Sequence, residues 1–248
     1  GMTDPALAAF AGLVFFLGGL SKGVLGMGLP TITLGLLALA MAPTEAAALL
    51  IVPSLVTNFW QMLAGGRFVA LCARLWPFLV TLAPSTALAA GALAGPLGER
   101  AGLALGLVLL GYAALTLSGR QWRLAPRHAG GAGAACGVAT GAVTGVTGVF
   151  VMPAVPYLAA IGLEKDELVQ ALGISFMVST LALAIGLGRA GVFDADAAFV
   201  SLAAVGPALA GMWLGQRVRA RLSLAAFKRA FFAFILALGA YLTVGGIL

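Results

Sequence analysis

The stretch Gly23-Val24-Leu25-Gly26-Met27-Gly28-Leu29-Pro30 returns in the second half of the chain as Gly145-Val146-Thr147-Gly148-Val149-Phe150-Val151-Met152-Pro153. Each copy interrupts an apolar segment with glycines and then with a proline. Glycine tolerates a positive φ, and proline fits the first turn of a helix because its missing N–H would be unpaired there. Each copy therefore predicts a helix break followed by a new helix N-terminus.

Other residues repeat at nearly the same offset. Glu45, Gly66 and Arg67 have counterparts 122 residues further on at Glu167, Gly188 and Arg189. The pair Gly91 and Gly95 returns after 120 residues as Gly211 and Gly215, and for both pairs we expect a role in close helix packing. Duplicated, glycine-interrupted apolar halves are typical of secondary transporters, whose substrate site forms where broken helices meet near the bilayer midplane.

The composition places the chain in a membrane. Of its 248 residues, 62% are hydrophobic and 9% are charged, and the mean hydropathy is +1.09. Such a chain cannot present the charged surface of an ordinary soluble domain. Its 35 glycines favour closely packed helices over a barrel, which would show short segments of alternating polarity. We therefore expect an all-α integral membrane protein.

Apolar runs separated by charge, glycine or proline predict ten helical elements. Those of the first half cover residues 5–20, 28–42, 44–64, 71–95 and 100–118. Those of the second half cover residues 129–145, 150–162, 167–187, 195–216 and 223–247. The expected organisation is a first transmembrane repeat at 1–118, a basic connection at 119–128 and a second transmembrane repeat at 129–248.

Five elements per half place the two halves in opposite orientations, because an odd number of crossings reverses the direction of the chain. The sequence therefore predicts two inverted five-element repeats related by an axis in the membrane plane. Four elements, 5–20, 28–42, 129–145 and 150–162, are short against the ~20 residues that cross the hydrocarbon core. They either span or form pairs that turn inside the protein near the midplane, and both readings stay open here.

Positive residues predict the orientation. If the elements alternate, most Lys and Arg residues fall on one side: Lys22, Arg67, Arg74, Arg120, Arg123, Arg127, Lys165, Arg217, Arg219, Arg221, Lys228 and Arg229. Arg100 and Arg189 fall on the other side. Because positive residues concentrate in cytoplasmic loops, we expect a cytoplasmic 119–128 connection and both termini on the opposite face. The net charge of +6 is then a topology signal and argues against nucleic acid as a partner.

The tandem pattern resembles a known family. A Gly-x-x-Gly segment followed by proline, an acidic residue opening the next helix, the polar pair Thr57-Asn58 within it and Gly-Arg after it are similar to the sulfite exporter TauE/SafE family over essentially the whole chain. The resemblance implies a TSUP-type permease of the bacterial inner membrane, and in that membrane the charge distribution above predicts periplasmic termini. It also implies small anionic substrates such as sulfite, thiosulfate or organosulfonates, or related carbon compounds. The second copy departs from the glycine-rich pattern at Val149, Phe150 and Val151.

The helix breaks are candidate anion sites, because free N–H groups and the helix dipole at an N-terminus favour oxyanions. The candidate ligands in the two motifs are Gly23, Gly26, Gly28, Gly145, Thr147 and Gly148. The alternative is that these glycines only allow helices to pack closely.

Polar side chains inside apolar helices extend the candidate site, since lipid offers them no partner. They are Thr57, Asn58 and Gln61 in the third element, with Ser175, Ser179 and Thr180 in the corresponding stretch of the eighth. Asn58 is the strongest candidate because its amide can donate two hydrogen bonds to an anion. The alternative for all of them is hydrogen bonding between helices. Trp60 is expected to pack rather than to bind a ligand.

Three cations, Lys22, Arg67 and Arg189, are candidates for attracting an anion to the entrances. Lys22 precedes the first glycine motif, where it serves either as a cytoplasmic entrance residue or as an anchor of a helix end at the interface. Arg67 and Arg189 would lie on opposite faces of an inverted repeat, with ordinary loop positions as the alternative.

The remaining ionisable residues point to structure rather than chemistry. Glu45 and Glu167 open helices, which favours capping over proton coupling. Asp194 and Asp196 are expected to cap the ninth element by the same reasoning. His128 is expected in the solvated connection, and Cys72 and Cys136 lack the spacing of a metal site and are expected to be free thiols. We therefore predict no catalytic residue, metal or cofactor.

These observations favour a secondary transporter, with the exporter direction expected, that moves a small anion through the lipid bilayer by alternating access. An anion channel and a permease for small carboxylates stay as alternatives. A membrane-embedded enzyme would need a nucleophile and base or paired carboxylates, which the apolar helices lack, and an assembly subunit gives no reason for two helix breaks. A homo-oligomer is compatible with the sequence.

Overall fold

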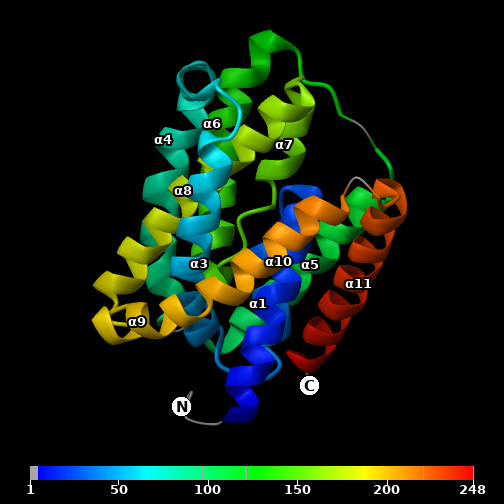
Figure 1. Cartoon of the computed structure of the whole chain (residues 1–248). Helices are drawn as coiled ribbons and strands as arrows, with labels where there is room; N and C mark the ends of the chain where they lie inside the picture. Colours follow the sequence, from blue (N-terminus) through cyan, green and yellow to red (C-terminus); the bar gives the residue numbers. More distant parts are fainter. Residues whose placement is uncertain (1–4, 96–97, 121, 220, 248) are drawn as a thin grey trace.

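The computed structural model describes residues 5–95, 98–120, 122–219 and 221–247 (Figure 1). The first half contains α1 (Pro5–Leu25), α2 (Leu29–Leu37), α3 (Pro43–Leu63), α4 (Phe68–Leu93), a 3-10 turn at Gly98–Arg100 and α5 (Ala101–Leu117). The second half contains α6 (Pro126–Thr147), α7 (Ala154–Ala160), α8 (Lys165–Arg189), α9 (Ala195–Ala203), α10 (Val205–Val218) and α11 (Leu224–Gly245). The described residues form no strand, so the prediction of an all-α protein is confirmed. The outer ends of the two predicted repeats, 1–4 and 248, lie outside the described residues.

Each predicted element is present, with three differences. The ninth element is divided at Ala204 into α9 and α10. The helices α1 and α6 are longer than predicted, at 21 and 22 residues. The helices α2 and α7 are shorter than predicted, at 9 and 7 residues, so of the four elements predicted to be short only these two are. Both long helices continue until the backbone turns left-handed, at Gly26 with φ 78° and at Gly148 with φ 74°. The sequence interpretation ended the first element before the charge of Lys22, but the helix continues through this residue.

Seven segments of the described chain are long and apolar enough to cross a membrane. They are α1, α3, α4, α6, α8, the continuous segment Ala195–Val218 and α11. The shorter α5 is also apolar. The chain is therefore a multi-pass membrane protein, as predicted.

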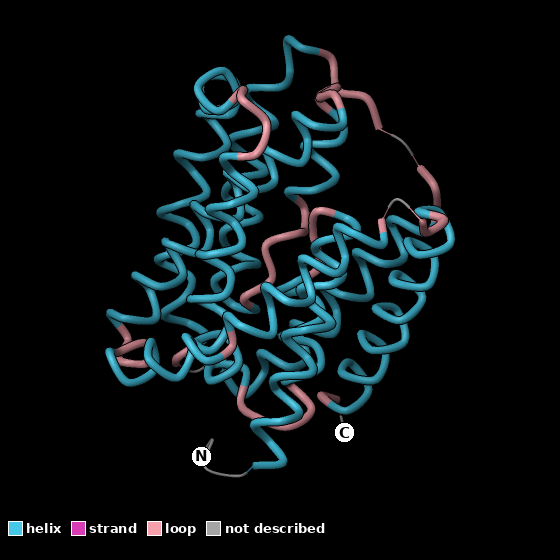
Figure 2. The backbone as a smooth tube through the Cα atoms, viewed as in Figure 1, coloured by secondary structure: helices cyan, strands magenta, loops and turns pink. Residues whose placement is uncertain are grey.

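The glycine motifs lie at the tips of two helical hairpins. The first tip joins α1 to α2, and the second joins α6 to α7; both appear as loop segments in the middle of the bundle (Figure 2). The α1–α2 hairpin returns to the end of the molecule where α1 begins and α11 ends, whereas α6 begins and α7 ends at the opposite end (Figure 1). The short elements thus turn inside the protein. The inverted relation of the two halves stays a prediction.

Helix pairing connects the two halves extensively. The helix α1 packs along α10, and α4 packs along α6, so the first helix of each half pairs with the fourth element of the other. The third helices, α3 and α8, pack together, as do the fifth, α5 and α11. This set of pairs is unchanged when the two halves are exchanged.

The α1–α10 contact depends on glycine, as predicted for Gly211 and Gly215. A Cβ atom at Gly211 would meet the carbonyl oxygen of Phe16, and one at Gly215 would meet that of Leu20. The equivalent prediction for Gly91 and Gly95 is wrong, because a Cβ at Gly91 meets nothing within 4 Å and one at Gly95 meets only carbonyls of its own helix.

In the α4–α6 contact the close approach is made from the α6 side. Cβ atoms at Gly137, Gly141 and Gly145 would each meet backbone atoms of α4. Close packing therefore uses glycines of α6 where the sequence interpretation assigned it to glycines of α4.

Ser201 supplies the hydrogen-bond donor that Pro53 cannot provide within α3. Proline has no N–H, so the Leu49 carbonyl one turn earlier lacks its helical donor. The Ser201 hydroxyl donates to this carbonyl at 2.7 Å and accepts from the Val52 N–H at 3.1 Å. A buried side chain of α9 thus fixes α9 against α3.

Replacing Ser201 by alanine is expected to destabilise the protein by about 1 kcal/mol, because the buried Leu49 carbonyl loses its donor. The measurement is the thermal unfolding midpoint in detergent. Ser118→Ala is the matched control, since the exposed Ser118 hydroxyl donates to the Leu115 carbonyl near a helix end. Equal midpoints for the two variants would contradict this role of Ser201.

Candidate functional site

Lys22 lies in the last turn of α1 and is buried, with 4% of its surface exposed. Its Nζ donates to Thr57 Oγ1 at 3.1 Å and to Asn58 Oδ1, both on α3. No carboxylate of the described residues pairs with it; the one salt bridge found there joins Arg67 and Glu167. An ammonium in the interior without a counter-charge costs several kcal/mol, so this position favours a bound anion. The sequence placed Lys22 at an entrance or an interface, whereas the structure places it inside.

The first glycine motif positions this lysine. The Gly26 N–H donates to the Lys22 carbonyl at 2.8 Å and closes the last turn of α1. Gly28, with φ 114°, then turns the chain into α2, where Pro30 occupies the first turn as predicted. A Cβ at Gly23 would meet the Met212 carbonyl, so Gly23 serves the packing of α1 on α10.

Gln61 holds the hairpin tip against both halves. Its Nε2 donates to the Gly26 carbonyl at 2.8 Å and to the Val169 carbonyl on α8 at 2.9 Å. Because Gln61 follows Thr57 by one helical turn, the two side chains share a face of α3 that contacts the end of α1. The predicted grouping of Thr57, Asn58 and Gln61 is therefore present in the structure.

Asn58 continues the hydrogen-bonded chain into the second half. Its Nδ2 donates to Thr180 Oγ1 at 3.1 Å, and Thr180 donates to the Phe176 carbonyl at 2.6 Å. Asn58 and Thr180 are 122 residues apart, the offset that relates Arg67 to Arg189. The bond thus joins equivalent positions of α3 and α8. It leaves Asn58 one uncommitted N–H in this conformation, where the sequence suggested two.

Several buried polar atoms of α2, α3 and α8 have no hydrogen-bond partner. They are Thr31 Oγ1 and Thr33 Oγ1 on α2, Ser54 Oγ and Gln61 Oε1 on α3, and Ser179 Oγ on α8. Buried polar groups are normally paired, so unpaired ones call for an explanation such as a bound ligand or water. All five belong to helices that pack on one another, α2 and α8 each contacting α3. The interior between α2, α3 and α8 therefore retains unused hydrogen-bonding capacity.

The second glycine motif is mainly structural. A Cβ at Gly145 would meet the backbone of Ala89 on α4. Thr147 Oγ1 donates to the Val143 carbonyl at 2.7 Å, and Ser175 Oγ donates to the Ala171 carbonyl at 2.7 Å. These candidates thus have partners within their own helices. Ser179 is the second-half candidate whose hydroxyl is uncommitted.

Apolar side chains fill the tip that follows Gly148. Val149, Phe150 and Val151 are buried, and the Phe150 ring lies 5.9 Å from the ring of Phe176. Pro153 precedes α7 as its N-cap instead of lying in its first turn. The departure seen in the sequence therefore gives the second tip an apolar environment that differs from that of the first.

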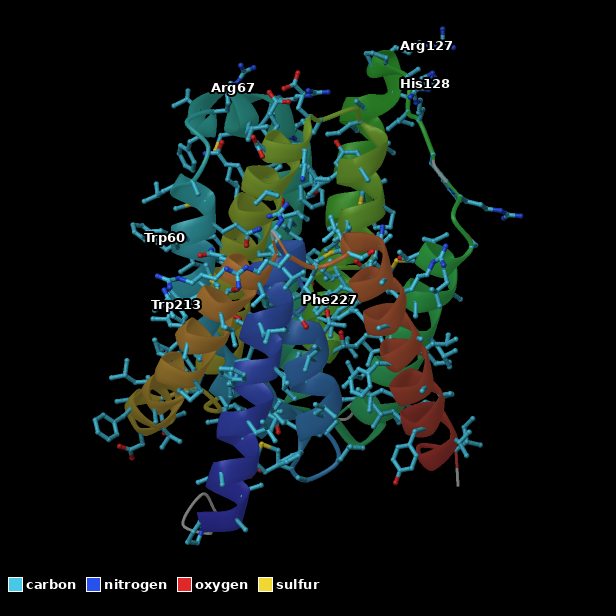
Figure 3. The ribbon with its side chains drawn as sticks, turned by 45° about the vertical axis from the view of Figure 1, so that its right-hand side comes forward. Trp60, Arg67, Arg127, His128, Trp213 and Phe227 are labelled. Carbon is cyan, nitrogen blue, oxygen red and sulfur yellow. The ribbon has the colours of Figure 1, made fainter. Side chains whose placement is uncertain are left out.

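Arg67 and Arg189 lie near opposite ends of α8. The Arg67 guanidinium, 63% exposed, contacts Glu167 Oε1 at 3.1 Å in the first turn of this helix. Arg189 is exposed in its last turn, 25 residues being about 37 Å of helix. Arg67 shares its end of the molecule with Arg127 and His128 (Figure 3). An exposed ion pair of this kind contributes less than about 1 kcal/mol.

The carboxylates expected to cap helices lie in the first turns. Glu167 Oε2 accepts from the Glu164 N–H at 3.2 Å, and Asp194 Oδ1 accepts from the Ala197 N–H at 2.9 Å. Glu45 is exposed in the first turn of α3, and Asp196 lies in that of α9. These positions support capping rather than a buried proton carrier.

Other residues that the sequence singles out, all within the described chain, form no hydrogen bond with Lys22. Trp60 is 64% exposed and points outward, where neither ligand binding nor core packing involves it (Figure 3). His128 lies in the first turn of α6 instead of in the connection, and accepts from Arg127 Nε at 2.8 Å. Cys72 and Cys136 are free thiols, as expected.

The cluster is closed to solvent. Asn58 is 2% exposed, and Thr57 and Thr180 are fully buried. Two surface pockets described in the structure are lined around Arg127 and His128 and around Arg67 and Gln170, and neither includes Lys22. An anion could reach this position only after the surrounding helices move.

Sequence reasoning selected Lys22 as a candidate but placed it at an entrance or an interface instead of in the interior. The burial of Lys22 could have been inferred by ending α1 at Gly26, because glycine in a left-handed conformation commonly terminates a helix. The pairing of Asn58 with Thr180 could have been inferred from the repeat, because the two residues are 122 positions apart.

Comparison with protein families gives one match. The model of the family described as sulfite exporter TauE/SafE matches residues 11–242, which is nearly the whole chain. Comparison with curated proteins and with solved structures returned no match.

Proposed function

The chain belongs to the sulfite exporter TauE/SafE family, which is a family of transporters rather than enzymes, and from this premise we propose that it exports small sulfur-containing anions across a bacterial inner membrane. The proposed substrates are sulfite, thiosulfate or organosulfonates. The proposed binding position is the cluster of Lys22, Thr57, Asn58 and Thr180, which we call the Lys22 cluster.

One observation carries this assignment: Lys22 is buried among neutral partners. A protein that only needed stability would place an apolar residue here, because a buried charge without a partner opposes folding. Inside membrane helices such residues are kept for function, commonly on a substrate pathway. An anionic substrate supplies the missing charge, and the unpaired hydroxyls of Ser54 and Ser179 are suited to its oxygens.

The proposed mechanism is alternating access. Two hairpins enter the bundle from opposite ends, Lys22 lies in the last turn of α1 in the first of them, and the helix pairs are unchanged when the halves are exchanged. Related halves of this kind rock around a fixed central site in secondary transporters. The bond between Asn58 and Thr180, at equivalent positions, lies where such a movement would be smallest.

The proposed orientation places both termini in the periplasm. The start of α1 and the end of α11 lie at one end of the molecule, and Arg67 and Arg127 lie at the other (Figures 1 and 3). Positive residues favour the cytoplasmic face. The membrane potential, negative inside, then drives an anion outward by ~2.3 kcal/mol per charge per 100 mV, which is sufficient for export without a coupling ion.

Sulfur anions are expected to raise the thermal stability of the purified protein in a saturable manner, because a ligand that binds only the native state stabilises it by mass action. The panel is sulfite, thiosulfate, sulfoacetate, taurine, sulfate and chloride. In Asn58→Ala the apparent affinity is expected to fall about tenfold, since the variant loses an amide that orients Lys22. Gln216→Ala removes an exposed amide on α10 and is the matched control.

Transport into proteoliposomes separates the remaining alternatives. A carrier shows a rate that saturates with substrate and accelerates with substrate on the opposite side. Flux that increases linearly with concentration would support a channel and contradict alternating access. Stabilisation by small carboxylates with no response to any sulfur anion would contradict the proposed substrates.

A further inference from the structure

We propose that the Lys22 cluster selects anions that carry a single negative charge. This inference rests on the proposed function and narrows its substrate class to bisulfite and monovalent sulfonates, at the expense of divalent anions such as sulfate, thiosulfate and sulfoacetate.

The buried interior contains a single formal charge. Among the buried residues of the described chain, Lys22 is the only one with an ionisable acidic or basic group of the Asp, Glu, Lys or Arg type; the other polar members are Ser, Thr, Asn and Gln. One ammonium and one monovalent anion form a neutral complex. A divalent anion would leave one negative charge without a partner in a closed site.

That uncompensated charge is costly. Transferring an unpaired ion from water into a protein interior costs several kcal/mol even after relaxation. Hydroxyls such as those of Ser54 and Ser179 can offer hydrogen bonds but no charge. Both N–H groups of Gln61 are committed to the carbonyls of Gly26 and Val169, and its unpaired Oε1 would repel a second negative charge.

Two arginines of neighbouring segments, Arg67 and Arg217, are engaged elsewhere. Arg67 is exposed at one end of the bundle and paired with Glu167. Arg217 lies over the ring of Trp213, 4.1 Å from its centroid, and Trp213 is itself exposed on the outer surface. Neither guanidinium reaches the closed interior in this structure, so the charge of the site is set by Lys22.

The test compares substrates of similar size that differ in charge, using the full-length protein in proteoliposomes. Ethanesulfonate carries one negative charge and sulfoacetate carries two. The Michaelis constant for ethanesulfonate is expected to be at least about tenfold lower than that for sulfoacetate. The reversal potential of the transport current should correspond to one charge per ethanesulfonate.

Sulfite provides a second comparison, because protonation alone changes its charge. As the pH rises through the second ionisation of sulfite, its Michaelis constant should increase in proportion to the loss of bisulfite. Ethanesulfonate stays monovalent over this range, so any change of its Michaelis constant with pH reports titration of the protein and is subtracted from the change measured with sulfite.

The outcomes separate the inference from the function on which it rests. Equal Michaelis constants for ethanesulfonate and sulfoacetate would overturn the charge selectivity and leave the sulfur-anion transporter standing. A sulfite constant that does not follow the bisulfite fraction would overturn it as well. If the protein transports none of ethanesulfonate, sulfoacetate and sulfite, the proposed function and the inference are both overturned.

Discussion

Replacing Lys22 by methionine is expected to reduce transport about 100-fold or more while raising the unfolding midpoint of the ligand-free protein. The variant loses the charge that would hold the anion, and truncating one partner of a buried charged pair costs about 2–5 kcal/mol in binding. Folding, in contrast, no longer requires an ammonium to leave water. The methionine side chain preserves most of the apolar stem, although Asn58 Oδ1 loses its donor.

The control is Lys228→Met, which removes an exposed lysine from α11. This variant is expected to retain the transport rate and the midpoint of the unmodified protein. The measurements are initial rates in proteoliposomes and thermal unfolding in detergent. A Lys22→Met protein with near-normal transport would contradict the proposed site, and one with a lower midpoint would show that Lys22 mainly stabilises the fold.

Replacing Gly211 by leucine is expected to destabilise the protein by about 3 kcal/mol or more, which is sufficient to prevent recovery of folded protein. A Cβ at this position would meet the carbonyl oxygen of Phe16 and lie 2.8 Å from the Leu20 N–H nitrogen. Both are backbone atoms of α1, which cannot move aside as a side chain can. The α1 and α10 helices would have to separate, and α1 carries Lys22.

Gly91→Leu is the matched control, because its side chain would meet open space on the exposed face of α4. Both substitutions replace glycine by a residue of higher helix propensity, and they differ in what surrounds the new side chain. The measurement is the fraction of monodisperse protein in detergent together with its unfolding midpoint. Equal behaviour of the two variants would contradict the packing role of Gly211.

Local chemistry explains why the elements could be predicted from the sequence. Apolar runs and breakers locate the ten elements, and positive-φ glycines such as Gly26 mark where the helices break. The predicted end of the first helix at residue 20 is wrong, because that prediction places the charged Lys22 at the surface. A helix can continue through a lysine inside a membrane protein when acceptors on a neighbouring helix bind the lysine ammonium. The local sequence does not show which helix will be that neighbour.

The sequence could predict most residues of the candidate site but not which helices bring them into contact. Spacing along α3 groups Thr57, Asn58 and Gln61, and the repeat points to the same level of α8. It could not show that α1 ends beside α3, or that Gly91 faces open space whereas Gly211 faces another backbone. These differences depend on which helix becomes the neighbour, and that is a property of the folded bundle.

The hydrogen bond between Asn58 and Thr180 joins equivalent positions of the two halves, as a contact at the twofold axis of a homodimer would. A symmetric homodimer of single halves would place every side chain near its twofold axis in duplicate, so any charge there would be even in number. In this chain the position 122 residues after Lys22 is Thr144, which donates its hydroxyl to the Thr140 carbonyl at 2.7 Å. Fusion of two gene copies lets one half keep a lysine that the other half lacks. A single charge near such an axis is therefore available to halves that have diverged in sequence and excluded for identical ones.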